Sequence, residues 1–331
     1  MGIFKFVYAV VSGEDDYYAE QALASMHSLR LYNPGCHITF ATDEETLGEL
    51  RESHSPIMEY VTECVTINAP EGFTPLQRSR YVKTLIREHI EGDFLFLDCD
   101  TIITGDLMQL ASFEGEVAAT LFQHIPHWKK GTLPGRLKEF YENTKVKEKF
   151  DFSFFCNGGV ILCKDTPLGH RLFKAWHEFW LESSTRYGYD YDQVNLWRAN
   201  ASLGNVLVEL DGIYNCQVIY KKAALRYLGD CRVVHYQTTS SICGYVPFKD
   251  PVVLEGIRQN GITVDVEGMI WSLKRYLHYF LNLTALEGFE LEVYNSPVVI
   301  VARNVSSTYD WTNKVIDFIC RLFFRKTLGS A

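Results

Sequence analysis

The stretch FLFLDCD at residues 94–100 decides the fold, because it joins an uninterrupted apolar run to two closely spaced carboxylates. Four consecutive apolar residues without polar alternation are typical of a strand that is buried on both faces of a parallel sheet. In open α/β sheets, ligands bind just beyond the carboxyl ends of the strands. The stretch therefore predicts a central strand that carries Asp98 and Asp100 into a ligand site.

The sequence on both sides of this stretch alternates between strand and helix patterns. Short apolar runs end at turn residues, and apolar side chains at helical spacing follow them. The expected strands are 4–11, 37–41, 60–67, 94–97, 117–122, 159–163 and 206–210. The expected helices are 17–32, 42–52, 75–90, 167–182 and 192–199. The alternation predicts the α/β class, with a mostly parallel, Rossmann-like sheet flanked by helices.

The composition argues against several classes of protein. Among 331 residues, 32 Lys and Arg stand against 41 Asp and Glu, and the net charge of −9 does not suit non-specific nucleic-acid binding. Nine cysteines without a Cys-x-x-Cys pair indicate neither a zinc cluster nor a disulfide framework. The N-terminal apolar run lacks a basic flank and a cleavage site, so we interpret it as a buried strand rather than a signal peptide. No uncharged apolar run reaches the roughly 18–20 residues that span a bilayer. We therefore expect a cytoplasmic protein with no nucleic-acid partner.

The spacing of Asp98 and Asp100 suits a metal site. On an irregular turn, two carboxylates one residue apart can reach the same hard cation. The alternative is that the two acids only cap a turn and the helix after it. The buried run before them favours the cation, because an apolar strand that delivers two carboxylates to its tip is an unusual arrangement.

The segment 94–101 resembles the aliphatic strand and Asp-x-Asp motif of nucleotide-sugar glycosyltransferases with the GT-A fold, in particular glycosyltransferase family 8. Further segments match that family's motifs in the family's order, and together they cover roughly residues 4–245. These segments are 15–18, 79–83, 155–162, 192–195 and 233–236. Two departures stand out: Val194 replaces the second Asp of the family's Asp-Gln-Asp motif, and the Lys-Pro-Trp that usually follows the metal-binding His is missing.

The resemblance implies a set of metal ligands. Asp100 and His235 would bind the metal directly, while Asp98 would share the ion or hold the ribose hydroxyls. Two carboxylate oxygens and one imidazole nitrogen suit Mn²⁺ better than Ca²⁺, with Mg²⁺ as the alternative. On its own, His235 would be an ordinary core or surface histidine, and its place in the family's order favours the ligand.

The resemblance also implies which residues bind a UDP-sugar donor. The expected donor-binding residues are Val10, Asp15, Tyr18, Arg80, Lys83, Asp98, Asn157 and Gly158. Arg80 and Lys83 are three residues apart on a predicted helix and share a face, for which a solvated basic surface is the alternative. Asp192 and Gln193 would lie at the reacting face of the sugar as catalytic residues, and the family implies retention of the anomeric configuration.

We expect two parts of the chain with different roles. Residues 1–247 form the nucleotide-sugar and metal-binding catalytic domain, and 248–331 form a C-terminal helical addition for acceptor binding and membrane association. The last segment, 311–331, is basic, aromatic and amphipathic, which is typical of helices in a membrane interface. A terminal helix docked on the core is the alternative. If the membrane prediction holds, the protein lies at the cytoplasmic face and the acceptor is lipid-linked.

The sequence thus predicts a metal-dependent hexosyltransferase that uses a UDP-sugar and a saccharide or lipid-linked glycan acceptor. Two other classes remain as alternatives. Phosphatases of the haloacid dehalogenase type also carry Asp-x-Asp after an apolar strand, although usually near the N-terminus. A non-catalytic binding protein could keep the same fold, because the Asp192 segment departs from the family's pattern.

Overall fold

The computed structural model describes residues 2–13, 16–125, 134–147, 150–152, 155–218, 221–237, 246–285, 311, 314–315 and 318. The chain divides into two compact units, Met1–Arg275 and Tyr276–Ala331. The first unit contains the sheets described below, and most of the second lies outside the described residues. The expected donor-binding residue Asp15 also lies outside them.

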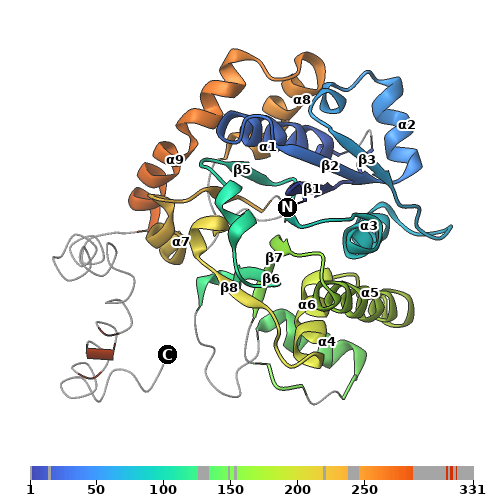
Figure 1. Cartoon of the computed structure of the whole chain (residues 1–331). Helices are drawn as coiled ribbons and strands as arrows, with labels where there is room; N and C mark the ends of the chain where they lie inside the picture. The colour runs from blue at the N-terminus through green and yellow to red at the C-terminus, as the bar shows by residue number, and fades with distance from the viewer. Residues whose placement is uncertain are drawn as a thin grey trace. The chain divides into compact units, whose positions relative to one another are not determined.

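Within the described residues, seven strands form a central sheet in the order β3-β2-β1-β4-β7-β6-β8 (Figure 1). The strands are β1 Lys5–Ala9, β2 His37–Thr42, β3 Glu63–Thr66, β4 Phe94–Leu97, β6 Val117–Leu121, β7 Cys156–Cys163 and β8 Val208–Leu210. β1 pairs parallel with β2 and β4, β2 with β3, and β6 with β8. β7 runs antiparallel to β4 and β6. The predicted α/β class with a mostly parallel sheet is confirmed, and β7 is its reversed strand.

A second, smaller sheet brings the later part of the chain to the tip of β4. It consists of β5 Thr101–Ile103, β10 Val233–His235 and β9 Cys216–Gln217, in that order. β10 pairs antiparallel with β5, so that His235 lies opposite Thr101, the residue after Asp100. This register places an imidazole beside the carboxylates although 135 residues (235 − 100) separate them in sequence.

Helices flank the central sheet. The α-helices of the described residues are α1 Tyr18–Tyr32, α2 Glu44–Glu52, α3 Pro75–His89, α4 Gly135–Thr144, α5 Pro167–Tyr187, α6 Asp192–Ser202, α7 Lys221–Leu228, α8 Pro251–Asn260 and α9 Val264–Ala285. In Figure 1, strands β1 to β3 lie between α1 on one side and α3 on the other. The predicted arrangement of a sheet covered by helices is therefore observed.

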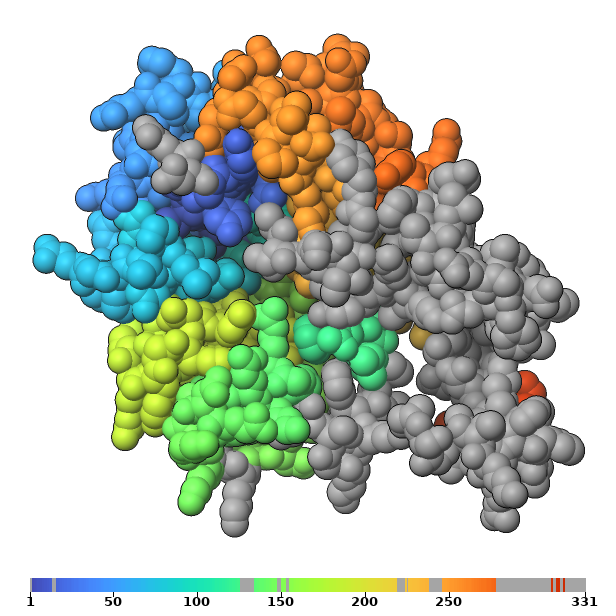
Figure 2. All heavy atoms as spheres, turned by 180° about the vertical axis from the view of Figure 1, so that it is seen from behind, coloured from blue at the N-terminus to red at the C-terminus, as the bar shows by residue number. Residues whose placement is uncertain are grey.

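Residues that follow position 247 pack against the N-terminal helix. The side-chain amide of Gln21 donates to the carbonyl oxygen of Phe248, at 3.1 Å. Arg258 Nε lies 2.9 Å from Glu20 Oε1. In the view from behind, the orange α8 region accordingly lies against the blue N-terminal segments (Figure 2). Helix α8 and the start of α9 thus belong to the first unit.

The core around β4 fixes the elements that carry the site. All four side chains of β4 are fully buried. Trp176, also fully buried, donates its indole N–H to the carbonyl oxygen of Asp192, at 2.8 Å. Trp197 donates to the carbonyl oxygen of Cys156, at 2.7 Å. Because a buried indole N–H needs a partner, these bonds hold the start of α6 and the start of β7 in place.

Two expected boundaries shift for local reasons. The helix expected from residue 42 begins at Glu44, because the Asp43 side chain caps it by accepting from the Thr46 amide, at 2.9 Å. The strand expected from residue 60 begins at Glu63, because Pro56–Glu59 forms a short 3₁₀ helix with proline in its first turn.

The expected interfacial helix at 311–331 is described at four positions. Trp311 and Phe318 are exposed at 68% and 62%, and Lys314 and Val315 are the other two described residues. The rest of this segment lies outside the described residues, so its membrane role stays a prediction. Among the helices that the structure describes, none is long and apolar enough to cross a bilayer.

Candidate functional site

The turn after β4 is held by backbone contacts with both sheets. The amide of Asp98 donates to the carbonyl oxygen of Gly159 on β7, at 2.8 Å. The amide of Tyr236 donates to the carbonyl oxygen of Asp100, at 3.1 Å. The Thr101 hydroxyl closes the turn by donating to the Asp98 carbonyl oxygen, at 2.8 Å. Both carboxylates are therefore carried by a fixed backbone.

Asp98, Asp100 and His235 form a cluster that could hold a metal ion. One ligand atom from each lies within 4.8 Å of those of the other two. His235 is 3% exposed, and its Nε2 lies 3.1 Å from Asp100 Oδ1. A Cβ atom added at Gly159 would lie 2.3 Å from His235 Cε1 and 2.8 Å from Asp98 Oδ2. The cluster therefore requires glycine at this position of β7.

The electrostatics of the cluster suit a cation. Burial raises the pKa of Asp98. Lys83 opposes this effect, and the neighbouring Asp100 adds to it. Burial alone would lower the pKa of His235, but the two carboxylates outweigh it and raise the pKa. Both shifts reflect two carboxylates and an imidazole held close together in a buried space, and a divalent ion bound by oxygen and imidazole ligands would favour the ionised carboxylates. This donor set fits Mn²⁺ or Mg²⁺.

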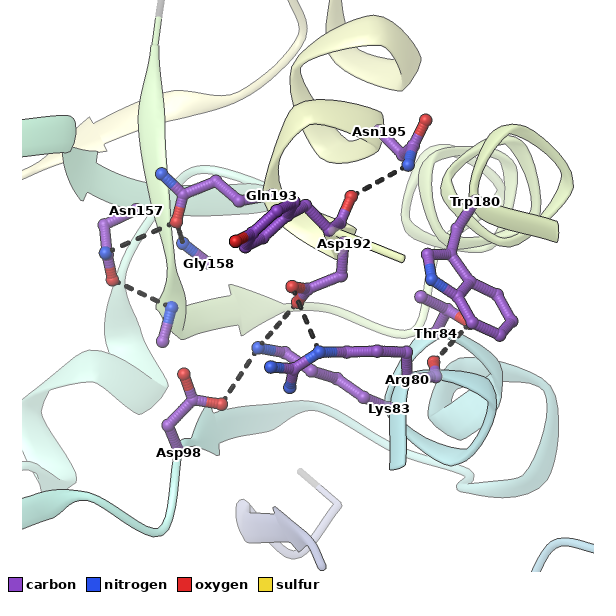
Figure 3. Close-up of polar contacts among 12 residues, drawn as sticks. Arg80, Lys83, Thr84, Asp98, Asn157, Gly158, Trp180, Asp192, Gln193 and Asn195 are labelled. Carbon is purple, nitrogen blue, oxygen red and sulfur yellow. Dashed lines mark hydrogen bonds and ion pairs between the residues drawn. The ribbon is translucent and has the colours of Figure 1, made fainter. Parts of the chain in front are cut away.

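A buried ion network joins this cluster to the start of α6 (Figure 3). Lys83 Nζ lies 2.9 Å from Asp98 Oδ1 and 3.0 Å from Asp192 Oδ2. Arg80 Nε lies 3.4 Å from Asp192 Oδ1. Burial would raise the pKa of Asp192, but Arg80 and Lys83 outweigh it and hold the pKa well below the usual range. Asp192 is therefore a carboxylate at neutral pH.

Lys83 is an interior cation, which excludes the solvated alternative for this side chain. Its side chain is 5% exposed, and Nζ lies 5.1 Å from the centre of the Phe96 ring. Burial alone would lower the pKa of Lys83, but Asp192 and Asp98 raise it overall. The ammonium group consequently stays charged and bridges the two carboxylates. The Arg80 side chain, at 30% exposure, is the more accessible of the pair.

Gln193 and Asn157 lie on the side of Asp192 that faces away from Arg80, as Figure 3 shows. Gln193 Oε1 faces the Asn157 side-chain amide at 3.5 Å and the Gly158 backbone amide at 3.4 Å. Among the described residues, the buried Gln193 Nε2 has no hydrogen-bond partner. A buried donor without an acceptor is costly, so this nitrogen is suited to bind a ligand oxygen.

The remaining predicted donor-binding residues lie near the start of the chain. Val10 is buried directly after β1, and its amide donates to the Ala41 carbonyl oxygen, at 3.0 Å. Tyr18 begins α1, is 38% exposed, and is close enough to the site that burial, Cys99 and Arg80 all affect its pKa, which is raised. The structure therefore brings together the metal cluster, Arg80, Lys83, Asn157, Gly158, Asp192 and Gln193, with Tyr18 at their edge.

Asn215 is a buried polar residue of the site that the sequence did not reveal. Its Oδ1 lies 2.9 Å from His235 Nδ1, and its Nδ2 donates to Asn157 Oδ1, at 2.8 Å. It directly precedes the two-residue strand β9, and no motif marks it. Only the pairing of β9 with β10, which the sequence does not show, would have indicated that Asn215 lies beside His235.

Comparisons with known proteins gave structural matches only. No family model matches the chain, and no curated protein matches it. Galactosyltransferase LgtC, solved with donor and acceptor sugar analogues, aligns at 14% identity and a TM-score of 0.46, over 80% of this chain and 99% of LgtC. Mouse xyloside xylosyltransferase 1 aligns at 12% identity and a TM-score of 0.45, over 72% of this chain and 99% of the enzyme.

A third solved structure is the glycosyltransferase GlyE of Streptococcus pneumoniae TIGR4. It aligns at 18% identity and a TM-score of 0.47, over 82% of this chain and 64% of GlyE. The three solved structures are thus glycosyltransferases to which this chain is similar at low identity. We base the function on the site itself.

Two neighbouring glycines test the shape of the cluster. Gly159→Ala would push His235 or Asp98 aside, so we expect Mn²⁺ affinity, measured by electron paramagnetic resonance of free Mn²⁺, to fall about tenfold or more. Gly158→Ala is the matched control, because its Cβ would meet only Leu196 Cδ2, at 3.4 Å. Equal Mn²⁺ affinity in both variants and the wild type would show that the cluster does not bind the ion.

The low pKa of Asp192 predicts a pH-dependent contribution to stability. Because the folded-state pKa is lowered, the contribution is present above the ordinary aspartate pKa of about 3.9 and is lost as pH falls through the folded-state value. Asp192→Asn should therefore reduce the free energy of unfolding by about 1–3 kcal/mol near neutral pH, and by less below about pH 4. Urea unfolding of both proteins across this range measures it. A difference that grows as pH falls would contradict the ion network.

Proposed function

We propose that this chain is a metal-dependent glycosyltransferase that transfers a hexose from a UDP-sugar to a saccharide or lipid-linked glycan acceptor. The observation that carries the proposal is the continuous site that runs from Asp98, Asp100 and His235 through buried Lys83 to Asp192 and Gln193. A cluster suited to a divalent ion at one end and the unpartnered Gln193 Nε2 beside the Asp192 carboxylate at the other match the two halves of a sugar nucleotide.

The metal end of the site would bind the diphosphate. Asp100 and His235 would hold a divalent ion, Mn²⁺ or Mg²⁺, with Asp98 sharing it or binding the ribose hydroxyls. When bound, the ion stabilises the negative charge that develops on the leaving diphosphate. Arg80, whose guanidinium is partly exposed, can pair with phosphate or hydroxyl oxygens. Lys83 orients Asp98 and Asp192 from the interior.

The other end of the site would bind the sugar. Asp192 is held ionised by two cations, so it accepts hydrogen bonds from sugar hydroxyls and is a poor general base. Gln193 can donate its unpartnered Nε2 to a sugar oxygen close to the reacting carbon. Asn157 and Gly158 complete this wall through their contacts with Gln193. We propose Asp192 and Gln193 as the catalytic residues of a retaining transfer.

The nucleoside site is proposed from the sequence resemblance, and the acceptor site from the composition of the C-terminal segment. We propose that Val10, directly after β1, and Tyr18, at the start of α1, lie beside the nucleoside, together with Asp15 from the sequence between them. The 248–331 addition would serve the acceptor, and the basic, aromatic segment 311–331 would contact the cytoplasmic face of a membrane.

Hydrolysis of UDP-glucose, UDP-galactose and their N-acetyl forms tests the proposed function. We expect Mn²⁺-dependent release of UDP from at least one donor, and a loss of about 100-fold or more in Asp100→Ala and His235→Ala. Asp265→Ala and His170→Ala, which remove exposed groups of the same types, should keep wild-type rates.

Two outcomes would contradict the proposal. Sugar-nucleotide turnover that survives both cluster substitutions would remove the metal assignment. Cleavage of simple phosphate monoesters without binding of any nucleotide sugar would favour a phosphatase of the haloacid dehalogenase type.

A further inference from the structure

Asn215 occupies a buried position between the metal cluster and the sugar side of the site. Its side chain is fully buried and contacts His235 Nδ1 through Oδ1 and Asn157 Oδ1 through Nδ2. His235 in turn places Nε2 at 3.1 Å from Asp100 Oδ1. A line of polar contacts therefore runs from Gln193 through Asn157, Asn215 and His235 to the cluster.

Backbone amides determine how the side-chain amides in this line are oriented. Asn157 Oδ1 accepts from the Gly159 amide, at 2.9 Å, so this atom is an oxygen. The atom of Asn215 that faces it must therefore be the NH₂ nitrogen. At the other end, Gln193 Oε1 accepts from the Gly158 amide, which makes the facing atom of Asn157 a nitrogen as well. Two backbone N–H groups of β7 thus give the same orientation independently.

This orientation fixes the protonation pattern of the His235 ring. Because Asn215 presents NH₂ to Asn157, it presents its carbonyl oxygen to His235 Nδ1. An oxygen that can only accept requires a proton on Nδ1. In the metal-free protein Nε2 also faces an acceptor, Asp100 Oδ1, and can carry a second proton. A bound ion would take the place of that proton and leave Nδ1 protonated.

We propose that Asn215 is a positioning residue for the metal site. It holds His235 in the Nδ1–H tautomer with Nε2 directed at the ion, and it ties this ligand to Asn157 on the sugar side. The inference rests on the proposed function, because it assigns Asn215 to the same site. Groups that orient a metal-binding histidine in this way usually contribute about 10–100-fold to metal affinity.

The first test is the Mn²⁺ dissociation constant, measured by electron paramagnetic resonance with Mn²⁺ alone and with Mn²⁺ plus UDP. Asn215→Ala removes both contacts and should weaken Mn²⁺ binding by about 10–100-fold. Asn215→Asp keeps an oxygen for His235 Nδ1 and should recover part of this loss. Asn200→Ala is the matched control, since it removes the buried amide that accepts from Leu207 at the far end of α6. It should lower the melting temperature and leave Mn²⁺ affinity unchanged.

The second test reads the wild-type protein and uses a variant only to assign the signal. Nitrogen-15 NMR of the wild type saturated with Mg²⁺, which is diamagnetic, distinguishes the two tautomers, and loss of the signal in His235→Ala assigns it. We expect the Nδ1–H form. An Nε2–H ring in the Mg²⁺-saturated wild type, or Asn215→Ala binding Mn²⁺ as tightly as Asn200→Ala, would overturn the inference. Neither measurement uses a UDP-sugar, so failure of the proposed transfer is detected separately, by the hydrolysis assays.

Discussion

The ion bridge made by Lys83 is the interaction on which the rest of the site depends. Its ammonium group lies between Asp98, at the tip of β4, and Asp192, at the start of α6. A buried charge is tolerated only when it is paired, and here one cation serves two carboxylates from segments almost a hundred residues apart. The bridge fixes the spacing between the Asp98–Asp100–His235 cluster and the start of α6. It also keeps Asp192 ionised, which makes that residue a hydrogen-bond acceptor.

Strand β7 supplies the second constraint. Its reversed direction between β4 and β6 places Gly158 and Gly159 beside the carboxyl end of β4. Gly159 gives His235 and Asp98 the space that a Cβ atom would fill, and the amides of both glycines orient Asn157 and Gln193. The eight-residue strand β7, with no side chain at two positions, thus shapes the cluster and positions Asn157 and Gln193 together.

Much of the fold was predictable because its signals are local. The four apolar residues of β4 and the alternation around them need no distant partner to be recognised, and helical spacing placed Arg80 and Lys83 on one face of α3. The small sheet was harder, because β5 and β9 are too short to show a pattern and are defined by pairing with β10. Asn215 was missed for the same reason. Helical spacing does not show how deeply a side chain is buried. The burial of Lys83 results from the packing of α3, β4 and α6 and could not be predicted from the sequence.

The central claim is that one site holds a divalent ion and the diphosphate of a UDP-sugar. A crystal structure of the protein grown with Mn²⁺ and UDP, with anomalous scattering to locate manganese, tests this most directly. The account predicts an anomalous peak between Asp100 and His235, with both phosphates of UDP on the same ion and Arg80 beside the nucleotide. Manganese bound elsewhere, or UDP bound without contact to this cluster, would contradict it.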